Sequence, residues 1–150
     1  MSKPSSATAL LQRPDGRFLM QLRDDGHGLV IPYPGAWNFP GGAVELGEQP
    51  LEAMLREVAE EFEITLDPND CREILRYAHA YATADHIFLC PVPPDTTPVL
   101  HEGAACEWMT LTEIAALKLG FDQEKIVEYL FKISKEGNVT ACFHDGRTSE

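Results

Sequence analysis

One stretch constrains the chain more than any other: residues 41–64, which read GGAVELGEQPLEAMLREVAEEFEI. After two glycines and an exposed loop, apolar residues recur at helical spacing. At about 100° per residue they fall within one arc roughly 100° wide; they are Leu51, Met54, Leu55, Val58 and Phe62. Pro50 suits the first helical turn, where its missing N–H costs nothing. The pattern predicts a helix that packs one face against a core.

The same stretch is strongly acidic. Residues 45–63 hold seven glutamates and one base, Arg56, so they account for half of the net charge of -12. On a helix, Glu52 and Glu63 point towards solvent, whereas three acids gather beside the apolar face: Glu57, Glu60 and Glu61. Such neighbours repel one another, and a hard cation with a preference for oxygen ligands, Mg²⁺ or Mn²⁺, relieves the repulsion. A solvated acidic face is the alternative.

The order of these residues favours the metal site. It follows G-x5-E-x7-R-E-U-x-E-E-x-G-U, where U is a bulky aliphatic residue, and it resembles the Nudix box. Eight of the nine fixed positions agree: Gly42, Glu48, Arg56, Glu57, Val58, Glu60, Glu61 and Ile64. The family's glycine near the helix end generally ends the helix in a left-handed conformation, and Glu63 replaces it here. On these residues the chain is identified as a member of the Nudix family.

The resemblance implies roles for the box residues. The family's principal metal ligands correspond to Glu57, Glu60 and Glu61, often joined by the backbone carbonyl at Gly41. Glu48 is a further candidate, for a second ion or a bridging water. The family's arginine, here Arg56, orients a glutamate of the box through a charged hydrogen bond. A plain surface ion pair is the alternative for Arg56.

Residues outside the box are candidates for the general base and for substrate contacts. The segment HEGAACEWM at 101–109 resembles one in the branch that cleaves 8-oxo-dGTP, so Glu102 is a candidate base or additional ligand, with a loop acid as the alternative. Arg23 matches a substrate-contacting arginine of the family, although a surface arginine is nearly as good an interpretation. The further candidates for substrate binding are Phe39, Gly42, Asp122 and Gln123. Of these, Phe39 suits a core position better.

Composition limits the class of protein. A chain of 150 residues with 44% apolar content predicts one domain over residues 1–150, with residues 1–5 and about 144–150 flexible. No apolar run approaches the roughly 20 residues of a membrane span, and the four cysteines include no C-x-x-C pair, so we expect a soluble, cytoplasmic protein with reduced thiols. The negative charge disfavours nucleic-acid polymers and anionic membranes as partners. A homodimer remains open.

Turn signals and hydrophobic patterns divide the rest of the chain. Asp24 to Gly35 is expected to be a long irregular loop, because it holds three glycines and two prolines. We expect helices at 111–117 and 122–132, the second capped by Asp122. The expected strands are 6–12, 18–23 (antiparallel to the first), 73–81, 85–92, 106–109 and a further one at 139–143. This agrees with the α+β fold that the resemblance implies, an α/β/α sandwich with a mixed central sheet.

These observations predict a Mg²⁺- or Mn²⁺-dependent pyrophosphohydrolase that attacks a nucleoside diphosphate linked to another group. The first hypothesis for the substrate is an ordinary or oxidised nucleoside triphosphate, cleaved to the monophosphate and pyrophosphate. ADP-ribose or another sugar nucleotide is the second. A hypothesis of another class is a catalytically silent nucleotide-binding regulatory module. Prenyl diphosphate isomerisation is weak, because the cysteine motif it requires is missing.

Overall fold

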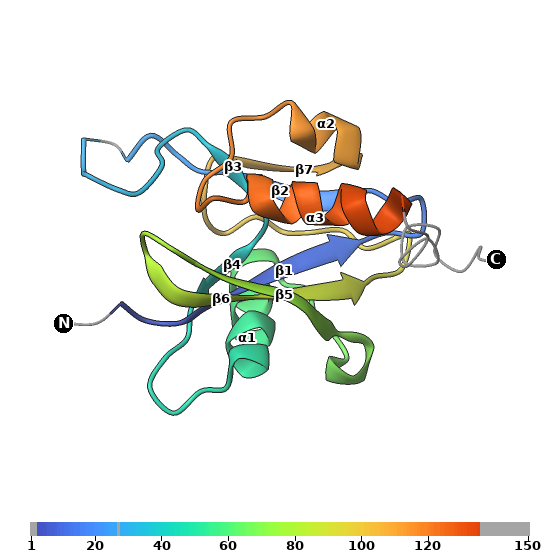
Figure 1. Cartoon of the computed structure of the whole chain (residues 1–150), viewed down its shortest axis with the longest axis horizontal. Coiled ribbons are helices and arrows are strands. Elements are labelled where there is room, and N and C mark those ends of the chain that lie inside the picture. Colours follow the sequence, from blue (N-terminus) through green and yellow to red (C-terminus); the bar gives the residue numbers. More distant parts are fainter. Residues whose placement is uncertain (1–2, 27, 136–150) are drawn as a thin grey trace.

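The computed structural model describes residues 3–26 and 28–135 of the chain (Figure 1). The strands are β1 (Ser6–Gln12), β2 (Phe18–Leu22), β3 (Trp37–Asn38), β4 (Gly41–Ala43), β5 (Arg72–His79), β6 (Ala82–Pro91) and β7 (Ala105–Met109). The helices are α1 (Pro50–Phe62), a 3₁₀ turn at Pro68–Asp70, α2 (Leu111–Ala115) and α3 (Glu124–Lys135). None of the helices in these residues is long and apolar enough to cross a membrane.

The strands form one mixed sheet. Its main path runs β3-β2-β1-β6-β5, with β4 paired to β1 and β7 paired to β2. The β1–β6 pair is parallel over its whole length, from Ser6 opposite Asp85 to Gln12 opposite Pro91. The other pairs are antiparallel, including the predicted β1–β2 hairpin.

Helices cover both faces of the sheet, because the strands alternate apolar side chains between them. On β1, Ala7, Ala9 and Leu11 pack in the cluster that contains the apolar residues of α1, including Met54, Val58 and Phe62. Leu10 points to the opposite face, where the cluster includes Ile126 and Leu130 of α3. In Figure 1, α1 lies below β1, β5 and β6, and α2 and α3 lie above these three strands. The predicted α+β sandwich is therefore confirmed.

The sheet forks between β1 and β2. These strands pair only next to their turn, where Gln12 faces Phe18. At the other end of β1, β4 takes the place beside it, with Thr8 opposite Gly41. A Cβ at residue 41 would lie 2.3 Å from the Ala7 carbonyl oxygen, so only glycine allows this approach. The fork leaves an opening between the ends of β1 and β2, bounded by β4.

Several details differ from the sequence-based expectations. The short strands β3 and β4 had not been predicted, since two or three residues give no readable alternation. Helix α3 begins at Glu124 rather than at Asp122, because Phe121 and Asp122 both adopt positive φ values, 57° and 56°, which end the preceding turn instead of starting a helix. The expected strand at 139–143 and the flexible end at 144–150 lie outside the described residues.

Helix α1 ends at a residue of unusual conformation. Glu63 follows the helix with φ 55° and ψ 38°, and its backbone N–H donates to the Ala59 carbonyl (3.0 Å). The left-handed exit that the family achieves with glycine is therefore kept by a glutamate. At the other end, the Glu52 carboxylate accepts the Gln49 backbone N–H (2.8 Å). This bond, from the N-cap N–H to the side chain three residues later, is one of the two that make up a capping box.

Candidate active site

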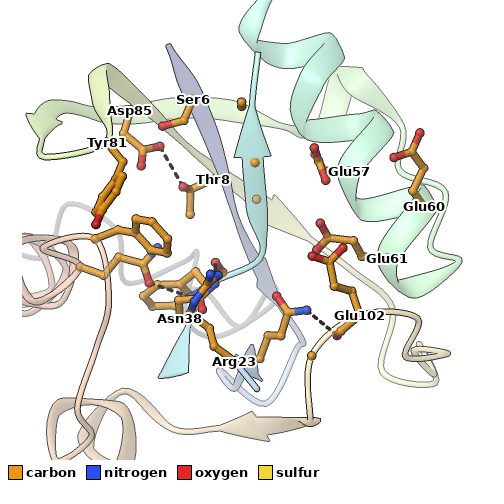
Figure 2. A pocket seen from close by; sticks show the side chains of 18 of the residues that line it. Ser6, Thr8, Arg23, Asn38, Glu57, Glu60, Glu61, Tyr81, Asp85 and Glu102 are labelled. Atoms are coloured by element: carbon orange, nitrogen blue, oxygen red, sulfur yellow. Dashed lines mark hydrogen bonds between the residues drawn. The ribbon is translucent and has the colours of Figure 1, made fainter. Parts of the chain in front are cut away.

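A cavity of about 640 Å³ occupies the fork of the sheet. Figure 2 shows two groups of side chains on opposite sides of β4: Glu57, Glu60, Glu61 and Glu102 on one side, and Tyr81 and Asp85 on the other. Gly41 and Gly42 of β4 line the cavity between them. Because glycines have no side chains, this strand leaves the two sides of the cavity connected.

Arg56 holds the acidic side together. Its Nε and Nη2 donate to the two carboxylate oxygens of Glu48 (2.7 and 3.0 Å), and Nη1 donates to Glu57 (3.1 Å) and Glu60 (3.3 Å). Nη2 also donates to the Ala43 carbonyl of β4 (3.2 Å). These bonds lower the pKa of Glu48 and raise that of Arg56. Arg56 thus joins the loop, the helix and β4, and in this structure it engages both oxygens of Glu48.

Glu61 is the most perturbed acid of the site. It is 7% exposed, and its Oε1 has no hydrogen-bond partner. Burial raises its pKa to about 9, helped by a hydrogen bond to Glu57 and by the charges of Glu57, Glu102 and Glu60. A buried, unpartnered oxygen among acids is a position where a cation replaces the missing compensation.

The residues present fit a hard divalent ion. All nearby donors are oxygen atoms, as such ions require, and the missing side chain of Gly42 makes room for one of them: a Cβ there would lie 2.4 Å from Glu57 Oε2. Within residues 3–26 and 28–135, however, no three acidic, thiol or imidazole groups are already arranged around a single point. The Glu60 side chain is 61% exposed and paired with Arg56, so binding by all three glutamates requires it to turn inwards.

The structure brings Glu102 to the acidic side. Its side chain points towards Glu61 (Figure 2), from the loop that precedes β7. Its backbone carbonyl accepts a hydrogen bond from the Gln21 side chain (2.7 Å). Gly103 follows with φ 90° and lies so close to β2 that a Cβ would be 2.8 Å from the Leu22 carbonyl. The loop is therefore held against the end of β2.

The aromatic rings of Tyr81 and Phe121 line the opposite side of the cavity, and Tyr33 packs behind them. The rings of Tyr33, Tyr81 and Phe121 contact one another edge to face, with centroids 4.8 to 6.0 Å apart. The Arg23 guanidinium lies over the Phe121 ring, 5.1 Å from its centroid, and its Nε donates to the Pro32 carbonyl (2.8 Å). Arg23 thereby holds Pro32 of the long loop close to the cavity wall.

The remaining substrate candidates differ in position. Phe39 is 1% exposed and packs edge to face on Phe18 in the core, although it also forms part of the cavity wall. Gln123 lines the cavity too, and its side-chain oxygen accepts the Phe39 backbone N–H (2.8 Å). Asp122, in the turn before α3, is not among the lining residues.

Sequence reasoning missed a buried polar chain in the cavity wall. Asp85 accepts hydrogen bonds from the Thr8 hydroxyl (2.8 Å) and from His79 Nε2 (2.9 Å). His79 Nδ1 accepts the Tyr81 backbone N–H (3.1 Å), which fixes the tautomer with the proton on Nε2. The only signal in the sequence was an acid at the start of an apolar strand. Asn38, whose buried Oδ1 has no partner, was missed as well.

Comparison with known proteins agrees with this geometry. The NUDIX domain model matches residues 2–130. A MutT-like protein of Streptomyces ambofaciens is 28% identical over 125 residues, 77% of this chain and 75% of the relative. The dihydroneopterin triphosphate diphosphatase of Haemophilus influenzae is 27% identical over 136 residues, 79% and 82% of the two chains. The solved structure of the MutT protein from Methanosarcina mazei Go1 superposes with a TM-score of 0.69 at 23% identity, covering 91% and 98%.

The structure combines a mixed sheet between helices with an acidic helix beside a cavity of about 640 Å³, and the family model over residues 2–130 assigns this arrangement to a hydrolase of phosphoric anhydride bonds. The chain belongs to the Nudix family. It is a MutT-like Nudix hydrolase that acts on pyrophosphate bonds, and the family implies a nucleotide-type substrate. Members of this family typically use a divalent metal ion.

Proposed function

We propose that the protein hydrolyses a nucleoside triphosphate, ordinary or oxidised, to the monophosphate and pyrophosphate with Mg²⁺ or Mn²⁺. The observation that supports this is the two-sided cavity. Glu57, Glu60, Glu61 and Glu102 line one side, aromatic rings with Arg23 and Asp85 line the other, and the two glycines of β4 lie between them. A phosphate chain with its metal ions suits the first side, and a flat base suits the second. The relative that acts on dihydroneopterin triphosphate also supports a triphosphate substrate.

Each residue of the acidic side has a proposed part in the reaction. Glu57, Glu60 and Glu61 would hold the ion, with the Gly41 carbonyl and Glu48 as further candidates. The bound ion neutralises charge on the phosphates and supplies an activated water. Arg56 orients Glu57 through the bond described above, whereas Glu60 would exchange its bond to Arg56 for the ion. Glu102, directed at Glu61, takes the proton of the attacking water.

The base-binding side is proposed to use Arg23 and the aromatic rings. Arg23 presents a fixed cation beside Phe121, where it can contact either the sugar or a phosphate oxygen. Gln123 and Phe39 shape the floor of the cavity. Asn38 Oδ1, buried without a partner, is free to accept a hydrogen bond from an N–H of the base.

A nucleotide panel tests the proposal. We would incubate the protein with ordinary and oxidised nucleoside triphosphates, dihydroneopterin triphosphate and sugar nucleotides, with Mg²⁺ or Mn²⁺ at several pH values, and identify the products by mass spectrometry. Reaction in ¹⁸O-labelled water shows which phosphorus is attacked. We expect a labelled product and release of pyrophosphate from a triphosphate.

Two outcomes would replace the proposal. Preferential cleavage of ADP-ribose or another sugar nucleotide would assign the protein to that substrate class, for which the cavity also has room. Nucleotide binding without any release of phosphate or pyrophosphate would indicate a silent regulatory module. The intact box glutamates disfavour the second outcome, since a pure binder has no need for mutually repelling ligands.

A further inference from the structure

The loop that carries Glu102 is docked on the C-terminal end of α1. The Val99 backbone N–H donates to the Phe62 carbonyl (2.9 Å), and the His101 N–H donates to the Glu61 carbonyl (2.9 Å). Carbonyls in the last turn of a helix lack partners within the helix, so the loop satisfies two of them. The main-chain carbonyl of Glu61 is thus hydrogen-bonded to His101, the residue that precedes Glu102.

The same loop is attached to β2 on its other side. The Ala104 N–H donates to the Leu22 carbonyl (2.8 Å), and Gln21 donates to the Glu102 carbonyl (2.7 Å). Segment 99–104 therefore bridges α1 and β2, and the Glu102 side chain projects from its middle towards Glu61 (Figure 2). Its direction depends on how the preceding residue, His101, is held.

Glu63 holds His101 from a strained backbone position. Its left-handed φ of 55° disfavours a glutamate, and glycine would adopt it without penalty. Its carboxylate Oε2 accepts a hydrogen bond from His101 Nε2. Both side chains are about half exposed, 54% for Glu63 and 49% for His101, so the pair contributes little to overall stability. A glutamate that costs backbone strain and adds little stability calls for another role.

We propose that Glu63 is a positioning residue that acts through His101 to keep Glu102 directed at the metal-binding glutamates. The inference rests on the proposed function, because it assumes that Glu102 acts in hydrolysis. It also gives a reason why this chain departs from the family glycine at the end of the box helix. Glu63 is not among the residues that line the cavity, so its effect must travel through segment 99–104.

The test combines stability, kinetics and hydrogen exchange for Glu63→Gly. The melting temperature should stay unchanged or rise, since glycine relieves the left-handed strain. We expect kcat to fall about tenfold with KM unchanged within about twofold, and the backbone amides of His101 and Ala104 to exchange faster. His101→Ala should reproduce the kinetic loss. Glu63→Gln and His101→Gln each keep a hydrogen bond between the two side chains, so these variants should retain most of the wild-type kcat.

A double-mutant cycle with Glu102→Gln separates positioning from other effects. If Glu63 acts through Glu102, Glu63→Gly causes little further loss of kcat in the Glu102→Gln background. Multiplicative losses, or wild-type amide exchange in Glu63→Gly, would overturn the inference. Failure of the proposed function is distinguishable, because it shows as a wild-type protein that hydrolyses no nucleotide, while hydrogen exchange still reports whether Glu63 fixes the loop.

Discussion

At the scale of single residues, Arg56 has the most demanding geometry. Its planar guanidinium makes two parallel bonds to Glu48 while also reaching Glu57 and Glu60. A lysine ammonium keeps the charge but cannot reproduce this fork. We therefore expect Arg56→Lys to lower kcat/KM by about 10- to 100-fold and to weaken Mn²⁺ binding, measured by titration calorimetry. Wild-type values for both would reduce Arg56 to a surface ion pair.

Glu60 gives a second test at this scale. Its exposed side chain supports nothing in the core, so Glu60→Gln should leave the melting temperature close to that of the wild type. If it turns inwards as a ligand, the same substitution should weaken divalent-ion binding and lower turnover by at least about a hundredfold. Glu128→Gln, an exposed glutamate on α3 beyond the sheet, is the matched control. Near wild-type turnover at low Mg²⁺ would remove Glu60 from the ligand set.

Helical spacing predicted that Glu57, Glu60 and Glu61 lie together, because a helix fixes the direction of each Cβ, whereas Glu102 was expected from the family resemblance. Glu57 and Glu61 face each other as expected, and α1 begins at Pro50. Glu63 was expected to face solvent, and its pairing with His101 could not be foreseen, since it joins residues 38 positions apart. The hydrogen-bonded chain Thr8–Asp85–His79 could not be predicted for the same reason, because its members come from three different strands.

At the scale of elements, the two glycines of β4 have different tasks. A Cβ at Gly41 would meet the backbone of β1, 2.3 Å from the Ala7 carbonyl oxygen, whereas a Cβ at Gly42 would meet the Glu57 carboxylate. Gly41→Ala must therefore push two strands apart and should lower the free energy of unfolding by about 1–3 kcal/mol. Denaturant unfolding measures this loss. An unchanged stability would mean that β4 can shift away from β1 freely.

Gly42→Ala should show the opposite pattern. The methyl group would displace only the end of a flexible side chain, so the stability should change little, while Glu57 loses its place and divalent-ion affinity falls. Calorimetric titration with Mn²⁺, beside the unfolding experiment, separates the two glycines. From the sequence, both residues were expected to form one glycine turn. Their separate roles depend on the pairing of β4 with β1, and the pairing of so short a strand cannot be predicted from the sequence.

At the scale of the whole molecule, the buried acid Glu61 makes stability depend on pH when no metal ion is bound. Its pKa is raised from 4.5 to about 9, first by burial and then by the hydrogen bond to Glu57. The folded protein therefore binds one more proton than the unfolded chain between these values. The contribution of this proton to the free energy of unfolding is complete below about pH 4.5 and is lost as the pH rises through about 9. A bound cation removes the need for that proton.

The expected result is that, with a chelator present, the contribution of Glu61 makes the free energy of unfolding fall from pH 5 to pH 9, by up to about 1.4 kcal/mol per pH unit. Glu61→Gln, which resembles the protonated acid in shape, should remove that slope, and the difference between the two proteins isolates this group. Mg²⁺ added at pH 8 should stabilise both proteins, because the ion binds only the folded state. The wild type should gain more, because the variant lacks the Glu61 carboxylate as a ligand. If the free energies of unfolding of the two proteins change with pH in parallel, with and without Mg²⁺, then burial does not raise the pKa of Glu61 and Glu61 does not bind the ion.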